Sequence, residues 1–168
     1  LKDSEKSKLY DGGIFITIYL APFNYHRIHS MVTGAINQFC YIPGDLWTVS
    51  PLGVHHVPKL FARNERLITY FETFNGECAL VKIGATVVGR IRVVYDNLTS
   101  NRPRAIFQNS LLEPPFRVGR GDEIGLFELG STVICLFPPG QIELKECERG
   151  NEVRLGQAIG KFSKIRKK

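Results

Sequence analysis

The Gly130-Ser131 step stands between two apolar runs, residues 124–127 and 133–137, and is the most chemically suggestive point of the chain. Glycine leaves its peptide carbonyl unshielded and allows close approach of a neighbouring group. A serine hydroxyl next to such a carbonyl becomes a nucleophile once a base takes its proton. The same dipeptide is also common at bulges and tight bends, so the residues alone leave both interpretations open.

A second polar segment, Tyr25-His26-Arg27-Ile28-His29, supplies two candidate bases. Imidazole titrates near neutral pH and is the commonest group for proton transfer. The histidines are three residues apart, and Pro22 argues against a regular helix around them. Taken alone, two histidines at this spacing are also typical of a surface loop or of a polar pair whose hydrogen bonds are satisfied. Arg27 is expected to be an ion-pair partner or a phosphate contact.

Five blocks of the chain, these two segments included, follow one family's order and rough spacing. The chain resembles phosphatidylserine decarboxylase, a pyruvoyl enzyme that cleaves itself at a Gly-Ser bond. The blocks cover nearly the whole sequence: Tyr19–His29, Tyr41–Leu46, Leu60–Arg66, Ile83–Gly89 and Leu129–Ile134. Five blocks in order are far more specific than any one of them.

The resemblance implies a maturation step at residue 131. Ser131 would attack the Gly130 carbonyl, and the resulting ester would break to leave a covalent pyruvoyl group, derived from pyruvate, at position 131. The catalytic domain, 1–168, would then consist of a β chain, 1–130, and an α chain, 131–168, joined as a heterodimer. Family members often pair further into dimers.

The implied reaction is the decarboxylation of phosphatidylserine to phosphatidylethanolamine through a Schiff base to that pyruvoyl group. By resemblance, His29 matches the histidine that activates the serine, and His26 the one that acts in decarboxylation. The family's processing triad also uses an aspartate from an upstream segment, which neither Asp3 nor Asp11 matches. A further departure is Asn24, where an acidic residue is common, which bears on how the histidine loop is held.

Two other functions remain as alternatives. One is a pyruvoyl decarboxylase of a soluble amino acid, against which the Tyr25–His29 block argues because it resembles only the lipid enzyme. The other is a noncatalytic, lipoyl-like binding module. That module would need an exposed lysine at a hairpin tip, and the expected hairpin at Asn75-Gly76 has none.

The charge balance points to an anionic partner. The chain has 168 residues and a formal net charge of +6, with a basic end at residues 161–168. A basic surface attracts nucleic acid or anionic lipid, although a solvated terminus has the same composition. No nucleic-acid motif with interleaved aromatics is present, so anionic phospholipid at a membrane surface is favoured. We expect a peripheral protein on the cytoplasmic face of a bacterial inner membrane.

No run approaches the ~18 apolar residues of a spanning helix. The chain begins at Leu1 without a visible signal peptide, and we expect a fragment or processed product, since the family usually has a longer N-terminal part.

Cysteine and histidine spacing does not favour a metal site. Cys40, Cys78, Cys135 and Cys147 form no CxxC pair, and the first three lie in strand-like segments as small buried hydrophobes, which suits a reducing compartment. His55 and His56 could join His26 and His29 around zinc. No acidic residue stands at a spacing such as HExxH, so no metal is expected.

The elements expected to position these residues are mainly strands. Apolar and β-branched runs separated by Gly and Pro favour a sandwich or barrel. Asn75-Gly76 predicts a hairpin, Pro58 weakens a short helix over 54–61, and 97–115 is predicted to be a long surface loop because it is polar and contains three prolines. The sequence predicts one mainly β domain, and the resemblance implies a β-barrel-like sandwich related to biotinyl and lipoyl carriers. The expected strands are 14–20, 36–42, 67–74, 77–83, 86–95, 124–127, 133–137, 142–144 and 153–155.

Overall fold

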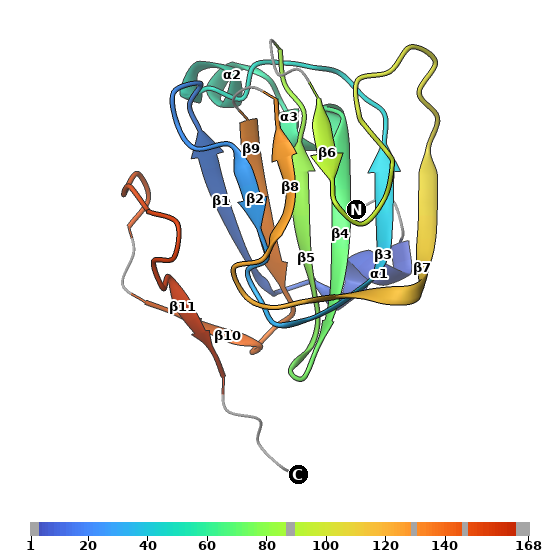
Figure 1. Cartoon of the computed structure of the whole chain (residues 1–168). Helices are drawn as coiled ribbons and strands as arrows, with labels where there is room; N and C mark the ends of the chain where they lie inside the picture. Colours follow the sequence, from blue (N-terminus) through green and yellow to red (C-terminus); the bar gives the residue numbers. More distant parts are fainter. Residues whose placement is uncertain (1–3, 87–89, 129–130, 146–147, 164–168) are drawn as a thin grey trace.

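The computed structural model describes residues 4–86, 90–128, 131–145 and 148–163. Its largest element is a six-stranded antiparallel sheet in the order β1-β9-β5-β4-β3-β7 (Figure 1). The strands in that order are β1 (Ile14–Leu20), β9 (Ser131–Phe137), β5 (Gly76–Ile83), β4 (Arg66–Thr73), β3 (Gly34–Ile42) and β7 (Gln108–Val118).

A three-stranded sheet, in the order β2-β8-β6, packs against one face of the six-stranded sheet (Figure 1). Its strands are β2 (Arg27–His29), β8 (Glu123–Phe127) and β6 (Ile91–Val93). Ile28, Ile91 and Ile124 from this sheet join Phe39 and Leu67 of the larger sheet in one buried apolar cluster. Burial of these side chains is the main stabilising term of the fold.

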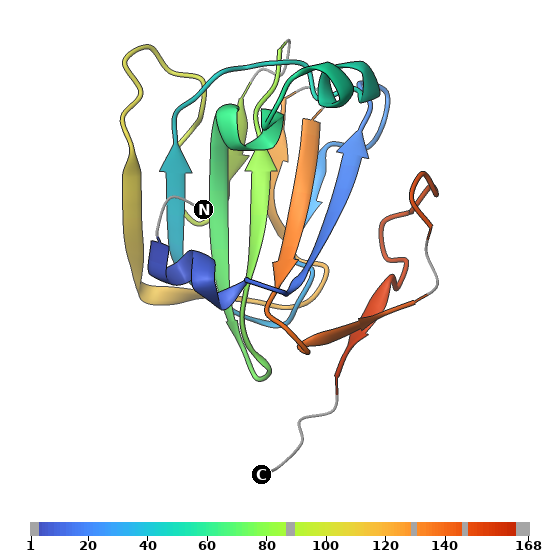
Figure 2. The same ribbon diagram turned by 180° about the vertical axis from the view of Figure 1, so that it is seen from behind.

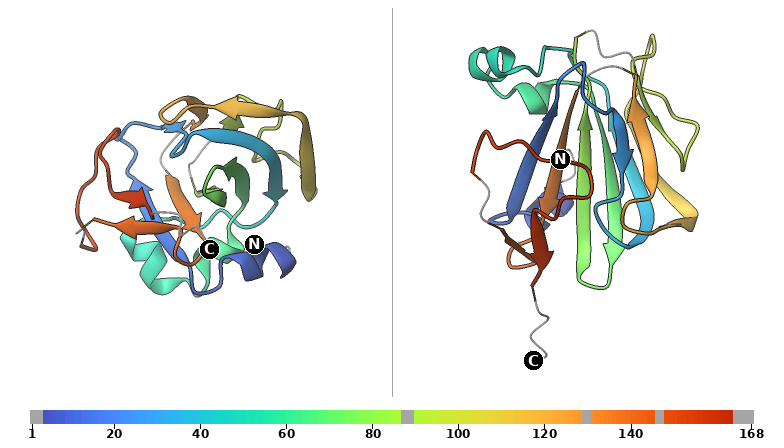
Figure 3. Two further views of the ribbon diagram at one scale, coloured as in Figure 1. Left: turned by 90° about the horizontal axis from the view of Figure 1, so that it is seen from below. Right: turned by 60° about the vertical axis from the view of Figure 1, so that its left-hand side comes forward.

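Three short helices, α1 (Ser4–Leu9), α2 (Pro51–His56) and α3 (Leu60–Arg63), lie on the other side of the six-stranded sheet (Figure 2). Lys6 on α1 forms an ion pair with Glu77 of β5 over 2.5 Å, which attaches this helix to the sheet. A two-stranded pair, β10 (Ile142–Leu144) and β11 (Gly160–Phe162), lies beside the β1 edge of the main sheet (Figure 3).

The mainly β prediction is confirmed, and the described sheets stay open rather than closing into a barrel, since β1 and β7 are separate edges. Strands over 14–20, 36–42, 67–73, 77–83, 124–127, 133–137 and 142–144 are found where they were predicted. The Asn75-Gly76 turn joins β4 to β5, and Gly76 adopts a φ of +99° that favours glycine. Pro58 falls between α2 and α3, which explains why 54–61 is not one helix.

The prediction of a loop over 97–115 is wrong from residue 108 onward, where β7 begins. Proline has no backbone N–H to donate, and it is tolerated in β7 because the outer side of an edge strand forms no hydrogen bonds with another strand. The register with β3 also shifts between Ile36 and Gln38, which pair with Phe116 and Leu111. Pro114 and Pro115 lie between Leu111 and Phe116, among the residues that this irregularity leaves without a pairing partner in β3.

Two further strand predictions need correction. Residues 153–155 form no strand, and the partner of β10 is instead Gly160–Phe162, with Ile142 opposite Phe162. Of the run 86–95, only Ile91–Val93 forms a strand, while 87–89 lie outside the described residues. Both errors come from short apolar runs, in which two or three side chains suggest a strand without specifying its partner.

Candidate active site

The chemistry-bearing segments gather at one end of the two sheets, the upper end in Figure 1. Strands β1, β3, β5 and β8 finish there, and β4 and β9 begin there, because neighbouring strands are antiparallel. The connection from β8 to β9 contains the Gly130-Ser131 step. Loops and strand ends are therefore the part of the fold that can hold a reactive site.

Ser131 is the first residue of β9, where the strand pairs with β1 and, from Thr132 onward, with β5. Ser131 pairs with Leu20 of β1, and the next residue, Thr132, pairs with Tyr19 of β1 and Ile83 of β5. Gly130, predicted to supply the attacked carbonyl, lies outside the described residues, as does Leu129.

His26 lies beside the strand that leads into this step. The Phe127 amide donates to the His26 carbonyl over 2.9 Å, which continues the pairing of Arg27 with Leu126. Its Nε2 atom is buried and has no hydrogen-bond partner among the described residues. A buried ring nitrogen without a partner is uncommon and marks a candidate functional group.

His29 lies further down the same short strand, opposite Glu123, so roughly 10 Å of strand separates the two histidine backbones. Its Nδ1 is 2.7 Å from the Gly121 carbonyl, and its Nε2 is 2.8 Å from the Tyr25 hydroxyl. Because a carbonyl only accepts, Nδ1 is the donor to Gly121, and in the neutral form of the ring Nε2 is left to accept from the Tyr25 hydroxyl. The Tyr25 and His29 rings also stack, with centroids 5.6 Å apart.

The residues around the histidines hold this loop in shape. Arg27 forms an ion pair with Glu123 over 2.6 Å, as the ion-pair interpretation predicted. Asn24 Oδ1 accepts from the Ala21 amide, and the Asn24 amide donates to the Ala21 carbonyl, both over 2.8 Å. Asn24 thus closes the turn after β1 with its amide side chain, a role that an aspartate would also fill.

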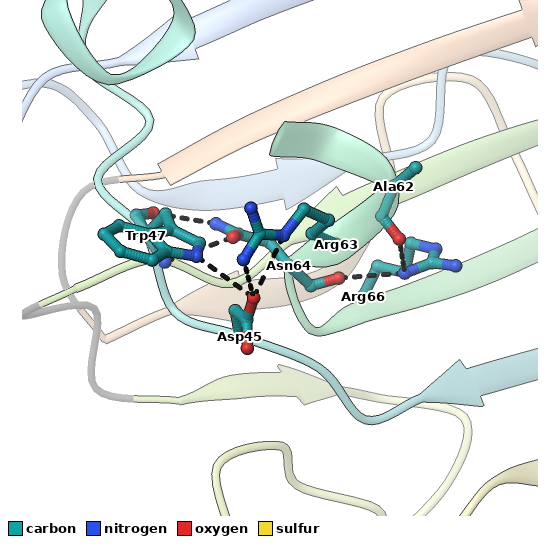
Figure 4. A network of polar contacts seen from close by, with 6 residues as sticks. All are labelled: Asp45, Trp47, Ala62, Arg63, Asn64 and Arg66. Carbon is teal, nitrogen blue, oxygen red and sulfur yellow. Dashed lines mark hydrogen bonds and ion pairs between the residues drawn. The ribbon is translucent and has the colours of Figure 1, made fainter. Parts of the chain in front are cut away.

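Asn64 ties the loop after β3 to the end of β5 (Figure 4). Its Nδ2 donates to the carbonyls of Trp47 and Gly84 over 2.7 and 2.8 Å, and its Oδ1 accepts from the Trp47 amide over 3.1 Å. Beside it, Arg63 forms an ion pair with Asp45 over 2.9 Å. Asn64 thus supports the loops at this end, and the ion pair beside it is formed by Arg63 and Asp45.

Glu65 lies in the polar triplet Asn64-Glu65-Arg66, for which the sequence leaves open a turn with an ion pair or support of the catalytic loop. It is only 4% exposed, and its Oε1 accepts from the Tyr41 hydroxyl and, over 2.7 Å, from the Asn101 amide. Burial and the adjacent Glu65 carboxylate raise the pKa of Tyr41 well above its usual value, so Tyr41 remains a donor. The burial of Glu65 gave no local sequence signal, because its partners are distant in the chain.

Lys82 is a second buried charged residue on β5. It is fully buried and donates to the Thr69 hydroxyl, with the Tyr95 hydroxyl 3.5 Å away. Burial lowers the pKa of Lys82 to about 7, since removal from water disfavours the ammonium form. Lys82 pairs with Val133, two residues beyond Ser131 in β9.

No zinc cluster forms from the four histidines within the described part of the chain. His55 and His56 contact each other on α2, and His56 Nδ1 is 2.8 Å from the Leu52 carbonyl. Cys40, Cys78 and Cys135 are buried, as predicted, and form no disulfide with one another, while Cys147 lies outside the described residues. Asp11 is exposed beside α1, and Asp3 is not among the described residues.

The protein is mainly β. One of its strands begins at Ser131, and the strand before it in the chain, β8, pairs with the segment that contains His26 and His29. The family model for phosphatidylserine decarboxylase matches residues 1–161. The chain therefore belongs to the phosphatidylserine decarboxylase family.

Curated relatives agree with this membership, and each is named phosphatidylserine decarboxylase proenzyme. The chain is 44% identical to the protein of Myxococcus xanthus over 163 residues, which cover 95% of this chain and 57% of that protein. It is 45% identical to the Brevibacillus brevis protein, covering 92% and 56%, and 40% identical to that of Coxiella burnetii, covering 98% and 58%. The chain thus spans a little over half the length of these relatives.

None of the helices in the described ranges is both long and apolar enough to cross a lipid bilayer.

Proposed function

We propose that this chain is the catalytic part of a self-cleaving phosphatidylserine decarboxylase, with the cut between Gly130 and Ser131. The observation that carries the proposal is the arrangement at the upper end of the sheets. The chain enters β9 at Ser131 immediately after the strand, β8, that pairs with the His26 segment. Family membership supplies the reaction, and this arrangement supports the assignment of residues to it.

The residues present fit a pyruvoyl group at position 131. Conversion of Ser131 would remove its amide nitrogen and make residue 131 the first residue of a new chain. Because residue 131 is also the first residue of β9, the strand-to-strand hydrogen bonds of the residues after it are kept. The Nε2 of His26, buried and without a hydrogen-bond partner in the described ranges, is a group able to hold or move a proton. When present, a pyruvoyl group supplies a ketone that condenses with the substrate amine and accepts the electron pair left by carbon dioxide.

The two chains would remain one folded body after the cut. Strand β9 lies between β1 and β5 and pairs with both along its length. An α chain of 131–168 would therefore contribute a central strand to a sheet built by the β chain, 1–130. Loss of one peptide bond at the start of β9 leaves this pairing intact, which supports the proposed β/α heterodimer.

We assign the proton-transfer role in decarboxylation to His26 and the activation of Ser131 to His29, as the resemblance implies. The position of His26 beside Phe127 supports its role. The Gly121 carbonyl holds the His29 ring in the tautomer with a basic Nε2, which is the form a proton acceptor needs. To reach the serine, this nitrogen has to exchange its hydrogen bond from Tyr25 for one from Ser131.

We further propose that the upper end of the sheets contacts an anionic membrane surface, where the lipid substrate resides. Large apolar side chains are exposed on the segments at this end: Phe23 in the β1–β2 loop is 88% exposed, and Leu52 on α2 is 70% exposed. Exposed aromatic and aliphatic side chains can enter the acyl boundary of a bilayer, and basic residues add attraction to anionic lipid. This surface favours the lipid substrate over a soluble amino acid.

The test is expression of the natural full-length polypeptide, followed by intact mass measurement and an assay of carbon dioxide release from phosphatidylserine vesicles. The proposal expects two chains and release of carbon dioxide from the lipid but not from free serine. An uncut and inactive wild-type protein would contradict it. Release from free serine alone would instead favour the soluble amino acid enzyme.

A further inference from the structure

Glu65 presents a buried carboxylate of which only one oxygen is used by the fold. The Tyr41 hydroxyl and the Asn101 amide both donate to Oε1 and hold the group from two separate segments. Oε2 is buried and finds no hydrogen-bond partner among the described residues. Since leaving a buried ionised oxygen unpaired is costly, such an oxygen is a candidate for binding a ligand.

The carboxylate lies against the backbone of Gly84. A Cβ placed on Gly84 would be 3.0 Å from Glu65 Oε2 and 3.2 Å from a methyl carbon of Leu46, so a larger residue would require both side chains to shift. Gly84 directly follows Ile83, whose partner in β9 is Thr132. One step further along both antiparallel strands brings Gly84 beside Ser131. Oε2 is thus directed to the part of the sheet where β9 begins.

Described basic side chains close to Glu65 in the chain or beside its partners donate to other acceptors. Arg102, which follows Asn101 and acts electrostatically on Tyr41, donates to the Thr99 hydroxyl over 2.6 Å. Arg66 donates to the carbonyls of Ala62 and Asn64 over 2.8 and 2.9 Å. Arg63 pairs with Asp45, and Lys82 donates to Thr69. The fold therefore fixes the orientation of the Glu65 carboxylate with neutral donors and leaves its second oxygen available to a cationic group from outside.

We propose that Oε2 of Glu65 binds the amine nitrogen of the lipid head group. The inference rests on the proposed function, which brings a primary ammonium group to position 131, next to Gly84. Substrate and product of the proposed reaction both carry that ammonium group. A carboxylate oxygen held in place by Tyr41 and Asn101 accepts a charge-assisted hydrogen bond from it and positions the nitrogen beside the reacting residue.

Two soluble probes isolate the amine contact from membrane binding: glycerophosphoethanolamine and its N-acetyl derivative, which lacks the positive charge. Their affinities are measured by titration calorimetry on cleaved protein, wild type and variants alike, whose pyruvoyl ketone has first been reduced with borohydride, so that neither probe can form a Schiff base and only the noncovalent contact is measured. We expect the amine to bind about 10–100-fold more tightly than the acetylated probe, as one charge-assisted hydrogen bond would provide. Equal affinities for the wild-type protein would overturn the inference.

The variant Glu65→Gln keeps the shape of the side chain and removes its charge. We expect it to bind both probes alike and to show less adduct by mass after borohydride treatment with phosphatidylserine. Glu77→Gln, at the far end of β5, is the matched control and is expected to retain the preference for the amine. A full preference in Glu65→Gln would contradict the inference.

A folding defect is controlled by thermal unfolding and by a second variant, Tyr41→Phe, which keeps the charge but loses one donor to Oε1. This variant is expected to weaken the preference for the amine partly, and an unchanged preference would count against the orienting role. If wild-type protein is uncut and inactive, the proposed function and this inference both fail. If it is cut and active while Glu65→Gln keeps its preference, only the inference fails.

Discussion

The amide of Phe127 donates to the carbonyl of His26 over 2.9 Å, and this bond attaches the histidine loop to the strand that precedes the Gly130-Ser131 step. The two segments are about one hundred residues apart in the chain, and only the pairing of β2 with β8 brings them together. His26 is therefore positioned by a backbone hydrogen bond, and its Nε2 has no hydrogen-bond partner among the described residues.

Replacement of either histidine by alanine should separate cleavage from decarboxylation. We expect His26→Ala to be cleaved and to lose ~10²–10⁴-fold in turnover, the usual contribution of a positioned proton-transfer group. We expect His29→Ala to accumulate as one uncut chain. Gel analysis and carbon dioxide release measure the two effects. Uncut His26→Ala together with cleaved His29→Ala would reverse the assignment.

Asn64→Ala should destabilise the fold without touching the proposed chemistry directly. The change removes three hydrogen bonds and leaves buried groups of Trp47 and Gly84 without their partner. At roughly 1 kcal/mol for each bond, the loss is about 3 kcal/mol. Thermal or denaturant unfolding measures it, with Asn109→Ala, which loses only an exposed contact to Gln38, as the control. Equal stability of the two variants would contradict this role for Asn64.

Lys82→Met should stabilise the protein, and the gain should depend on pH. The ordinary lysine pKa of 10.5 in the unfolded chain falls to about 7 in the folded protein. Between these values the unfolded state binds the extra proton, so wild-type stability rises with pH. The advantage of Lys82→Met is therefore greatest below pH 7 and declines toward pH 10.5. Denaturant unfolding at pH 7 and 10 measures this, and an advantage equal at both would contradict it.

Exposed apolar side chains at the upper end of the sheets should promote vesicle binding. Phe23→Ser or Leu52→Ser is expected to weaken sedimentation with anionic vesicles roughly tenfold, if the side chain is buried in the bilayer. Phe74 is 91% exposed but lies in the β4–β5 turn at the opposite end, so Phe74→Ser is a matched control (Figure 1). An equal loss in all three variants would contradict a specific membrane-facing end.

Local sequence patterns were sufficient for most strands of the larger sheet. β1 and β5 are dominated by β-branched and apolar residues, and Asn75-Gly76 marks the turn that sets the β4–β5 register. The same rules failed for β7, because they treat Pro114 and Pro115 as loop residues and do not reveal that the strand lies at an edge. Edge position depends on the whole sheet order, which no single segment encodes.

Site residues were predictable only where a motif marks them. Ser131, His26 and His29 stand in recognisable blocks, and their roles stay predictions; the structure places Ser131 at the start of β9 and His26 beside Phe127 of β8. The contact of His29 with Gly121 spans 92 residues, and Glu65 meets Asn101 across 36. Such contacts arise from topology, so the sequence contained no local signal that Glu65 is buried and oriented.

The most direct test of the proposed cleavage is the intact mass of the natural full-length polypeptide beside its Ser131→Ala variant. We predict that the wild-type protein yields two chains that meet between residues 130 and 131. The second chain should have a blocked N-terminus whose mass corresponds to a pyruvoyl group, and the variant should remain one chain. A wild-type protein that stays uncut while releasing carbon dioxide from phosphatidylserine would contradict the account, as would a Ser131→Ala variant that is still cleaved.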